Sequence, residues 1–276
     1  MVGNPERRGV MQVRPGVEFA HLSDVGCQRR ENEDSFGIWE PDTPAEFEYK
    51  GILAVVADGM GGYEGGREAS QIAVNTLCEV YQQADGDPQD ALLAGLQTAH
   101  TRIQEFAGQH PGFFGMGTTC TAISLSGSQL RFAHVGDSRL YLVRGTSIAR
   151  LTRDDSYVSR LVEAGLINEE EAESHPQRHI LTAALGVGAD LTPDSPVRPV
   201  TLFDGDVLVL CTDGLWGQVN DHELHHLVST KTPSEACAQL VKLARDRGGP
   251  DNITVEVLRF SSPGSGGEAN PLPAIS

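Results

Sequence analysis

The helical segments of this sequence are grouped and do not alternate one for one with strands. Helices are predicted over 67–83, 88–108, 156–164, 168–174, 221–229 and 233–247, and in the first of these Ala69, Ile72, Ala73, Leu77 and Val80 form one apolar face at helical spacing. The first two segments directly follow the third predicted strand, and the last two directly precede the final strand. A parallel sheet needs a crossover between successive strands, so this grouping favours antiparallel sheets with helices packed outside. The expected class is α+β.

Strands are predicted from apolar, β-branched or alternating runs over 17–23, 35–39, 51–58, 118–125, 129–135, 139–144, 206–212 and 253–260. No linker-like stretch separates these runs. We therefore expect one domain over residues 15–260, preceded by a flexible N-terminus over 1–14. Residues 261–276 are rich in Ser, Gly and Pro, and this composition predicts a disordered tail.

The acidic balance of the chain restricts its partners. It carries 21 Lys and Arg against 38 Asp and Glu, a formal net charge of −17. Nucleic acid and anionic membranes repel such a surface, so neither is an expected partner. No apolar run reaches the roughly 20 residues of a membrane span, and residues 1–10 lack the apolar core of a secretory signal. The five widely spaced cysteines fit reduced thiols, so we expect a cytoplasmic protein and, by default, a monomer.

Two apolar strands end in the same dipeptide. The segment 52–57 runs into Asp58-Gly59, and the segment 207–212 runs into Asp213-Gly214. A lone Asp-Gly usually marks a hairpin turn, but neither dipeptide is followed by a second alternating strand. Further acids stand at the ends of other predicted strands: Asp24, Glu33, Asp34, Asp137 and Asp251. Acids at the ends of neighbouring strands are expected to meet at one rim of the fold.

Such a cluster of carboxylates predicts bound cations. Carboxylates within a few ångströms of one another repel unless protons or cations intervene, and an all-oxygen ligand set suits Mg²⁺ or Mn²⁺ better than Zn²⁺. Arg29 and Arg30 lie close by in the sequence, and a guanidinium is suited to bidentate recognition of phosphate. The spacing alone leaves open that these acids never meet and that the arginines are an ordinary surface pair.

Several short motifs follow one another in a fixed order along the chain. They are Ser23–Asp34 (SDVGCQRRENED), Ala57–Gly62 (ADGMGG), Gly117–Thr119 (GTT), Val135–Arg139 (VGDSR), Cys211–Trp216 (CTDGLW) and Gly248–Val255 (GGPDNITV). As an ordered set, between about residues 17 and 260, they resemble the protein phosphatase 2C family in its bacterial form. His175–Arg178 and Leu181–Gly186 also resemble the flap region of that family.

The resemblance implies a β-sandwich of two stacked antiparallel sheets flanked by helix pairs, in four layers αββα. It implies a metal-dependent protein serine/threonine phosphatase that hydrolyses phosphoserine and phosphothreonine. A hydroxide shared by two Mg²⁺ or Mn²⁺ ions would attack phosphorus, with no phosphoenzyme intermediate. The implied partners are phosphorylated proteins, made in turn by a bacterial Ser/Thr kinase.

The resemblance also assigns roles to individual metal ligands. Asp58 would bridge both metals and take part in catalysis, and the carbonyl of Gly59 would bind one of the metals. Asp213 and Asp251 would complete the shell of the other. Asp137 matches the position that holds a third, weaker metal in bacterial members.

Other positions would act on the substrate or through water. Glu33 and Asp34 would contribute to catalysis mostly through metal-bound waters, and Arg29 would grip the substrate phosphate. Residues 153–180 would form the mobile flap. Many eukaryotic members carry His directly after the first Asp-Gly as a proton donor, whereas this chain has Met60. The proton donor for the leaving group is therefore unassigned, with a metal-bound water as the working hypothesis.

Other chemistries find weaker support in the sequence. His222–His226 fits the H-E-x-x-H pattern of zinc proteases, but a predicted N-cap at Asn220 places it in the first turn of a short helix. A metal- or phosphoprotein-binding pseudo-enzyme is a second alternative, which the complete set of predicted ligands disfavours. His134 and His179 lack ligand spacing and are interpreted as core or surface residues.

Overall fold

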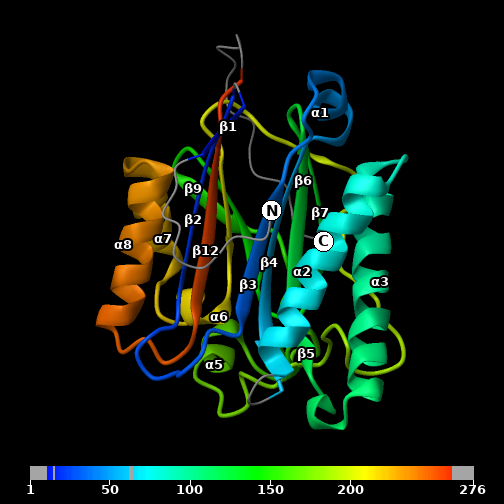
Figure 1. Cartoon of the computed structure of the whole chain (residues 1–276). Coiled ribbons are helices and arrows are strands. Elements are labelled where there is room, and N and C mark those ends of the chain that lie inside the picture. Colours follow the sequence, from blue (N-terminus) through cyan, green and yellow to red (C-terminus); the bar gives the residue numbers. More distant parts are fainter. Residues whose placement is uncertain (1–10, 15, 62–64, 263–276) are drawn as a thin grey trace.

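Two antiparallel sheets stack face to face, and a pair of long helices covers the outer face of each (Figure 1). The computed structural model describes residues 11–14, 16–61 and 65–262 of the chain. Its four layers, helix–sheet–sheet–helix, confirm the α+β sandwich expected from the sequence. Within the described residues no helix is long and apolar enough to cross a membrane.

The first sheet contains the last strand of the chain in its interior. In order, its strands are β1 (Met11–Arg14), β2 (Val17–Asp24), β12 (Ile253–Phe260), β11 (Val207–Cys211), β8 (Arg139–Arg144) and β9 (Ser147–Arg150). All neighbouring strands are antiparallel. The end of β11 and the start of β12 therefore lie side by side, at the end of the sheet where these strands stop or begin.

The second sheet is built around a strand with two apolar faces. Its order is β10 (Val200–Thr201), β7 (Gln129–Val135), β6 (Cys120–Ser126), β4 (Ile52–Met60) and β3 (Asp34–Trp39), with β5 (Gly117–Thr118) pairing to the end of β4. Residues 52–57 of β4 are all buried. Alternate side chains of a strand point to opposite faces, so β4 faces the other sheet on one side and helices on the other.

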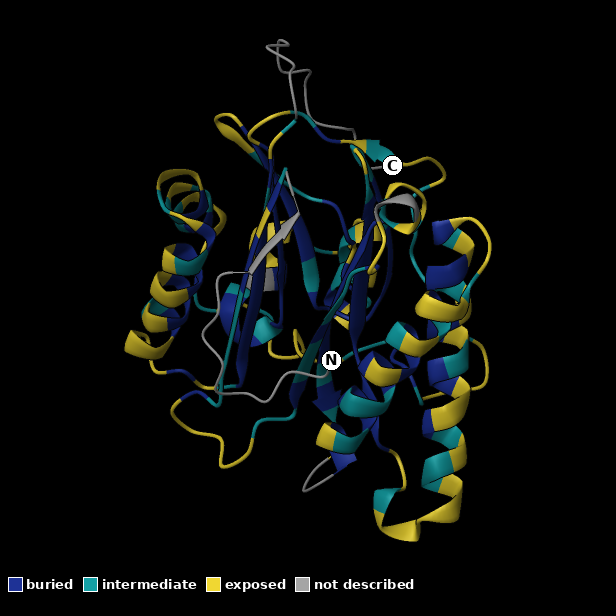
Figure 2. Ribbon diagram, turned by 45° about the horizontal axis from the view of Figure 1, so that its top comes forward, coloured by how far each residue is buried: buried dark blue, intermediate teal, exposed yellow. Residues whose placement is uncertain are grey.

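The long helices cover the sheets in pairs. Helices α2 (Gly65–Gln83) and α3 (Pro88–Gln109) pack on the second sheet, and α7 (Asp221–Thr230) and α8 (Pro233–Asp246) pack on the first. Their inward faces are buried and their outward faces exposed (Figure 2). Shorter elements are α1 (Pro44–Lys50), η1 (Pro111–Phe113), α4 (Tyr157–Glu163), α5 (Glu169–Glu173) and α6 (Asp213–Trp216).

The apolar core has three parts, which correspond to the three contacts between layers. One cluster lies between the two sheets and includes Phe19, Ile52 and Leu208. A second lies under α2 and α3, and a third lies under α7 and α8.

The long predicted elements match the structure closely, and the differences are short elements. The structure adds β1, α1, β9, β10, η1 and α6 to the predicted set. Met11–Arg14, expected to belong to a loose N-terminus, pair with β2 as β1. Residues 1–10 and 263–276, which make up most of the expected flexible ends, lie outside the described part of the chain.

A glutamate is buried in the middle of β12, within the sheet. Glu256 is 0% exposed, and neither of its carboxyl oxygens has a hydrogen-bond partner among the described residues. Its strand neighbours are His21 on β2 and Leu210 on β11. Removal from water raises the pKa of Glu256 well above its usual range. Burial therefore favours the neutral acid form of this side chain in the folded protein.

We expect Glu256→Gln to remove a pH dependence from the stability of the fold. The unfolded Glu256 carboxyl loses its proton above a pKa of about 4.3, whereas the folded one keeps its proton to a higher pH. The wild-type free energy of unfolding should therefore fall with rising pH, by up to about 1.4 kcal/mol per pH unit while the folded group stays protonated. Denaturant titrations from pH 5 to 8 measure this slope.

The control is Glu105→Gln, on the exposed side of α3. Its free energy of unfolding should depend on pH as that of the wild type does. The free energy of unfolding of Glu256→Gln, in contrast, should exceed the wild-type value by an amount that grows as the pH rises. An unchanged slope in Glu256→Gln would contradict the assignment of a neutral buried acid.

Candidate metal centre

Two acidic residues face each other across neighbouring strands at one end of the sandwich. Asp34, the first residue of β3, is the register partner of Asp58 near the end of β4. Like charges directly opposite on paired strands repel and destabilise the sheet. Removal from water, together with the neighbouring carboxylates of Asp34 and Asp213, raises the pKa of Asp58 well above its usual range.

The first sheet brings two more carboxylates to the same place. Asp213 follows β11 as the first residue of α6, and Asp251 stands just before β12, so the antiparallel pairing of these strands puts both at one edge. Burial raises the pKa of Asp213 to about 6, and the negative charge of Asp251 acts in the same direction. The centre thus draws carboxylates from both sheets.

The oxygens of Asp34 have unequal partners. Its Oδ2 accepts hydrogen bonds from Thr212 Oγ1 at 2.9 Å and Thr254 Oγ1 at 2.7 Å. Its Oδ1 is buried without a partner among the described residues, and Asp213 Oδ1 is in the same position. Burial raises the pKa of Asp34 to about 7, although the two threonine hydrogen bonds oppose this rise. Two buried oxygens thus remain available to a further ligand.

These groups fit a divalent cation in their chemistry. Buried oxygens without partners, on carboxylates that raise one another's pKa, are the donors that Mg²⁺ or Mn²⁺ prefers. Across the described residues, however, no three His, Cys, Asp or Glu side chains already form a closed ligand set. One reason is that Arg29 Nη2 donates to Asp251 Oδ2 at 2.7 Å and holds that carboxylate as its own partner.

The backbone of Asp58 is fixed by two of the sequence motifs. Its carbonyl oxygen accepts hydrogen bonds from Thr118 Oγ1 at 2.8 Å and Thr119 N at 2.9 Å, and its own N–H donates to Thr119 Oγ1 at 2.9 Å. Thr119 Oγ1 lies 2.6 Å from Ser138 Oγ, which belongs to the VGDSR motif. The GTT motif therefore acts as a support for Asp58.

Two glycines allow the end of β4 to approach the start of α2. A Cβ added to Gly59 would lie 2.0 Å from the carbonyl oxygen of Gly66. A Cβ added to Gly66 would lie 2.7 Å from the carbonyl carbon of Gly59 and 2.9 Å from Glu33 Oε2. The Gly59 N–H also donates to the Glu33 carbonyl at 3.2 Å. Glu33 is thereby held between β4 and the N-terminus of α2, where the helix dipole favours its negative charge.

Asn252 ties the arginine-bearing loop to the metal-ligand loop, a role that the sequence analysis missed. Its Nδ2 donates to the carbonyls of Val25 at 3.0 Å and Glu31 at 2.9 Å, and its Oδ1 accepts from Glu33 N at 2.8 Å. Three hydrogen bonds from one buried side chain fix the path of the loop that carries Arg29. The position of Asn252 next to Asp251 was the only signal in the sequence.

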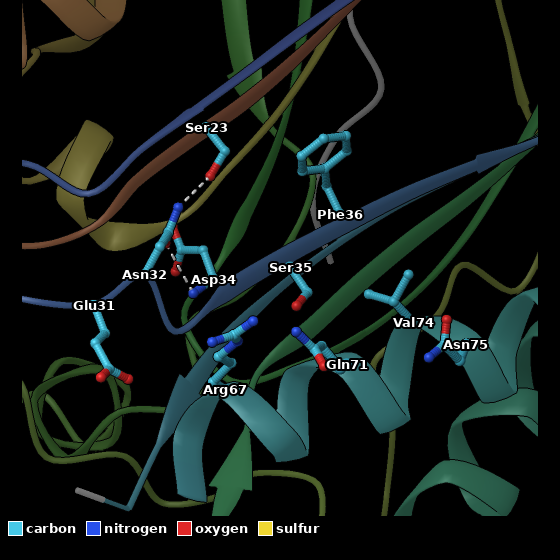
Figure 3. A pocket seen from close by; sticks show the side chains of 10 residues that line it. All are labelled: Ser23, Glu31, Asn32, Asp34, Ser35, Phe36, Arg67, Gln71, Val74 and Asn75. Carbon is cyan, nitrogen blue, oxygen red and sulfur yellow. Dashed lines mark hydrogen bonds between the residues drawn. The ribbon is translucent and has the colours of Figure 1, made fainter. Parts of the chain in front are cut away.

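A cavity of about 360 Å³ lies behind Asp34, between β3 and α2. Figure 3 shows Asn32 at its wall, donating from Nδ2 to Ser23 Oγ at 2.8 Å and accepting from Asp34 N at 3.2 Å. Arg67 and Gln71 of α2 line the opposite side. The hydrogen bonds of Asn32 support Asp34 from the side away from the other carboxylates.

Asp137 lies on the opposite flank of the cluster. It follows β7, is 5% exposed, and its carbonyl accepts a hydrogen bond from Trp216 Nε1 at 2.9 Å. Burial, followed by the charge of Asp213, raises its pKa well above the usual range. The predicted third-metal residue therefore belongs to the same electrostatic cluster.

A histidine that the sequence analysis interpreted as a core or surface residue also lies at the centre. His179, in the segment 153–180, has its Nδ1 3.9 Å from Asp213 Oδ2. The base of this segment is closed by hydrogen bonds from Tyr157 N to the Ile180 carbonyl at 2.8 Å and from Thr182 N to the Asp155 carbonyl at 2.7 Å. His179 comes from an irregular stretch, so periodicity gave no signal for it.

The zinc-protease pattern serves a structural purpose. Glu223 accepts the Asn220 N–H at 3.2 Å in a capping box, and its carboxylate forms a bidentate ion pair with Arg247. His225 Nε2 lies 3.0 Å from the Gly145 carbonyl. The glutamate is therefore engaged in holding the start of α7.

Fold and site together define a class, a four-layer αββα sandwich with an acidic metal centre at one end, and known proteins share it. The sequence profile of the protein phosphatase 2C family matches residues 29–245. Serine/threonine protein phosphatase PstP of Mycobacterium tuberculosis is 37% identical over 246 residues, a match to 87% of this chain and 44% of PstP. The chain thus spans less than half the length of PstP. Protein phosphatase PhpP of Streptococcus pneumoniae is 33% identical over 250 residues, covering 89% of this chain and 98% of PhpP.

A solved structure agrees with the sequence matches. The catalytic domain of PstP in complex with two manganese ions superposes with a TM-score of 0.77 and 32% identity, over 90% of this chain and 99% of that one. The chain belongs to the protein phosphatase 2C family. The resemblance to its bacterial members, and with it the expectation of a metal-dependent serine/threonine protein phosphatase, is confirmed.

We expect Gly66→Ala to disturb the centre without replacing any of its carboxylates, because the new Cβ would press on the Gly59 backbone and on Glu33 Oε2. The new Cβ would collide with backbone atoms of Gly59, which cannot move aside as a flexible side chain would. The free energy of unfolding should be about 1–3 kcal/mol lower than that of the wild type. A displacement of about 1 Å at Glu33 and Gly59 should lower the hydrolysis rate of para-nitrophenyl phosphate about 100-fold.

Gly108→Ala, in α3 with no atom within 4 Å of the added Cβ, is the matched control and should be neutral or stabilising. Denaturant unfolding and the initial rate, measured on both variants, are sufficient. Wild-type values for Gly66→Ala would show that the close approach of β4 and α2 is dispensable.

Proposed function

We propose that the chain hydrolyses phosphoserine and phosphothreonine in proteins at a centre holding two Mg²⁺ or Mn²⁺ ions. The observation that carries this proposal is the convergence of four carboxylates from two sheets beside one arginine. Membership of the protein phosphatase 2C family supports it. Further support comes from two relatives that are protein phosphatases, PstP and PhpP, and from the two manganese ions in the PstP structure. The catalytic domain would comprise residues 15–260, with a flap over 153–180.

Membership of the family implies the ligand roles. Asp58 would be shared by the two ions, and the carbonyl of Gly59, the next residue of β4, would bind one of them. Asp213 and Asp251 would hold the other ion. Asp137, on the flank nearest Asp213, would take a third.

Glu33 and Asp34 would act through water. Asp34 Oδ2 is already engaged by two threonines, so its free Oδ1 is the oxygen available to orient water. When bound, a pair of divalent cations lowers the pKa of a water towards about 7 and neutralises charge on the phosphate. The chain then needs no side-chain nucleophile and forms no phosphoenzyme.

Arg29 would bind the substrate phosphate. Its side chain is 51% exposed, so it can leave Asp251 and place its planar donors on two phosphate oxygens. The same movement would free Asp251 Oδ2 for its role as a ligand. The side chain of Met60 has no proton to donate. We therefore propose that a water molecule protonates the leaving alkoxide.

The substrates would be phosphoproteins made by a bacterial Ser/Thr kinase, and the enzyme would act as a cytoplasmic monomer. The net charge of −17 supports a protein that binds neither nucleic acid nor anionic membranes.

The test is hydrolysis of para-nitrophenyl phosphate and of a phosphothreonine peptide with Mn²⁺ or Mg²⁺, against EDTA. We expect turnover only with the metals. Asp213→Asn should lower it at least about 100-fold, because the variant loses a charged ligand. Calorimetric titration with Mn²⁺ should show weakened binding in the same variant.

Asp90→Asn, on the exposed start of α3, is the control and should match wild type in both measurements. A folded protein without turnover in any divalent metal would contradict the proposal and favour a pseudo-enzyme. Zn²⁺-dependent cleavage of casein would instead support the H-E-x-x-H pattern.

A further inference from the structure

The cavity behind Asp34 is a slot between two elements that the proposed chemistry does not use. One wall is β3, with Ser35 and Phe36, and the opposite wall is α2, from Arg67 to Asn75 (Figure 3). Its volume of about 360 Å³ falls in the range of sites for small ligands. Its lining includes no residue of the flap. Asp34 stands at the boundary, since it belongs both to this slot and to the carboxylate cluster.

Three polar side chains of α2 line the slot at a regular spacing. Arg67, Gln71 and Asn75 follow one another at intervals of four residues, so they lie along one side of the helix (Figure 3). Within the described part of the chain, none of these three side chains has a hydrogen-bond or ion-pair partner. Phe36 and Val74 add apolar surface between them. The slot therefore offers two primary amides, each with a donor and an acceptor, to a ligand.

The charged groups of the slot do not favour either sign of ligand charge. Arg67 contributes one guanidinium and Glu31 contributes one exposed carboxylate. The remaining acid is Asp34, whose Oδ2 already accepts hydrogen bonds from Thr212 and Thr254. Balanced charges together with amide groups select an uncharged polar ligand. The main chain of a peptide is such a ligand, and it is present in every protein substrate.

The slot also lies along a free edge of the second sheet. Among the described strands, β3 is the last in the order and pairs with β4 alone. An edge strand presents main-chain N–H and C=O groups on its unpaired side, and the addition of an extended peptide to such an edge is a recurring mode of recognition. The N–H of Asp34 is taken by Asn32 Oδ1 at 3.2 Å. Beyond the pairing with β4, the main chain of Ser35 and Phe36 forms no hydrogen bond with the described residues.

The spacing of the two amides matches that of an extended chain. Four residues of an α-helix rise about 6 Å, and two residues of an extended peptide span about 6.6 Å. Gln71 and Asn75 can therefore each meet every second residue of one extended segment. Arg67 comes one turn earlier and directly follows Gly66, where a Cβ would lie 2.7 Å from the carbonyl carbon of Gly59. The row of side chains thus starts beside the metal centre and leads away from it.

We infer that this slot binds the main chain of the substrate segment next to the phosphorylated residue, in extended form between β3 and α2, with Gln71 and Asn75 as its contacts. The inference rests on the proposed function and narrows its substrate class. Contacts with the main chain are independent of side-chain identity, so phosphoproteins of different sequence are accepted. A phosphorylated residue within a helix is excluded, because its main-chain groups are already paired.

The test uses phosphothreonine peptides in which one main-chain nitrogen at a time, before or after the phosphothreonine, carries a methyl group. Each kcat/KM is divided by that of the same enzyme for para-nitrophenyl phosphate, which has no main chain. For the wild type, methylation on one side should lower this ratio about fivefold at the contacted positions, the effect of one lost hydrogen bond. Gln71→Met and Asn75→Leu should each lower the ratio for the unmethylated peptide by a similar factor. In the double variant, methylation at those positions should cause no further loss.

Gln83→Met is the matched control, since Gln83 is exposed at the end of the same helix and does not line the slot. It should keep both the wild-type ratio and the wild-type sensitivity to methylation. A wild-type ratio that methylation changes on neither side would overturn the inference, as would a sensitivity that persists in the double variant.

Fluorescence anisotropy of the same peptides gives a second readout, which needs no turnover. It is measured on Asp213→Asn, in which hydrolysis is expected to be slow, with and without the two slot substitutions. Methylation should weaken binding only where Gln71 and Asn75 are present, and equal affinities throughout would overturn the inference. Binding that follows this pattern, together with a wild type that hydrolyses no peptide, would uphold the slot and contradict the proposed function.

Discussion

Repulsion among buried carboxylates is the force that the rest of this structure has to contain. Asp34 and Asp58 come from one sheet, and Asp213 and Asp251 come from the other. Burial raises the pKa of Asp34, Asp58 and Asp213, and the negative charge of Asp251 acts in the same direction on all three. The stacking of the sheets, which buries the central apolar cluster, brings these charges together. Hydrophobic burial thus holds the carboxylates at a separation that they would not adopt on their own, and a cation is the natural complement to that arrangement.

Hydrogen bonds around the centre fix the carboxylates and the loops near them. Thr212 and Thr254 bind one oxygen of Asp34, the GTT motif fixes the backbone of Asp58, and Asn252 fixes the loop of Arg29. None of these groups needs to contact a substrate to matter. They leave particular oxygens free and others engaged, so they decide which lone pairs a ligand can meet.

The long helices and strands, and the acidic residues at the ends of the strands, could be predicted from the sequence. Apolar spacing in 67–83 and the continuous run 52–57 predict a helix and a doubly covered strand, because burial dominates their energetics. The short helix α6 starts at Asp213, where the sequence resembles a turn, and it packs against β12 and α8, which are distant in the sequence. His179 and Asn252 were beyond prediction for the same reason, since their partners lie far away in sequence. Whether each predicted ligand binds metal stays a prediction.

The position of β12 has a consequence for the life of the protein. This strand is the last in the described chain, yet it inserts between β2 and β11 and carries Thr254, two residues after Asn252 and three after Asp251. A nascent chain, even with both helix pairs complete, lacks the central strand of its first sheet until β12 has been made. The cluster of carboxylates would then stay incomplete until β12 has joined the sheet, because Asp251 and the Thr254 hydroxyl that binds Asp34 arrive together with this strand.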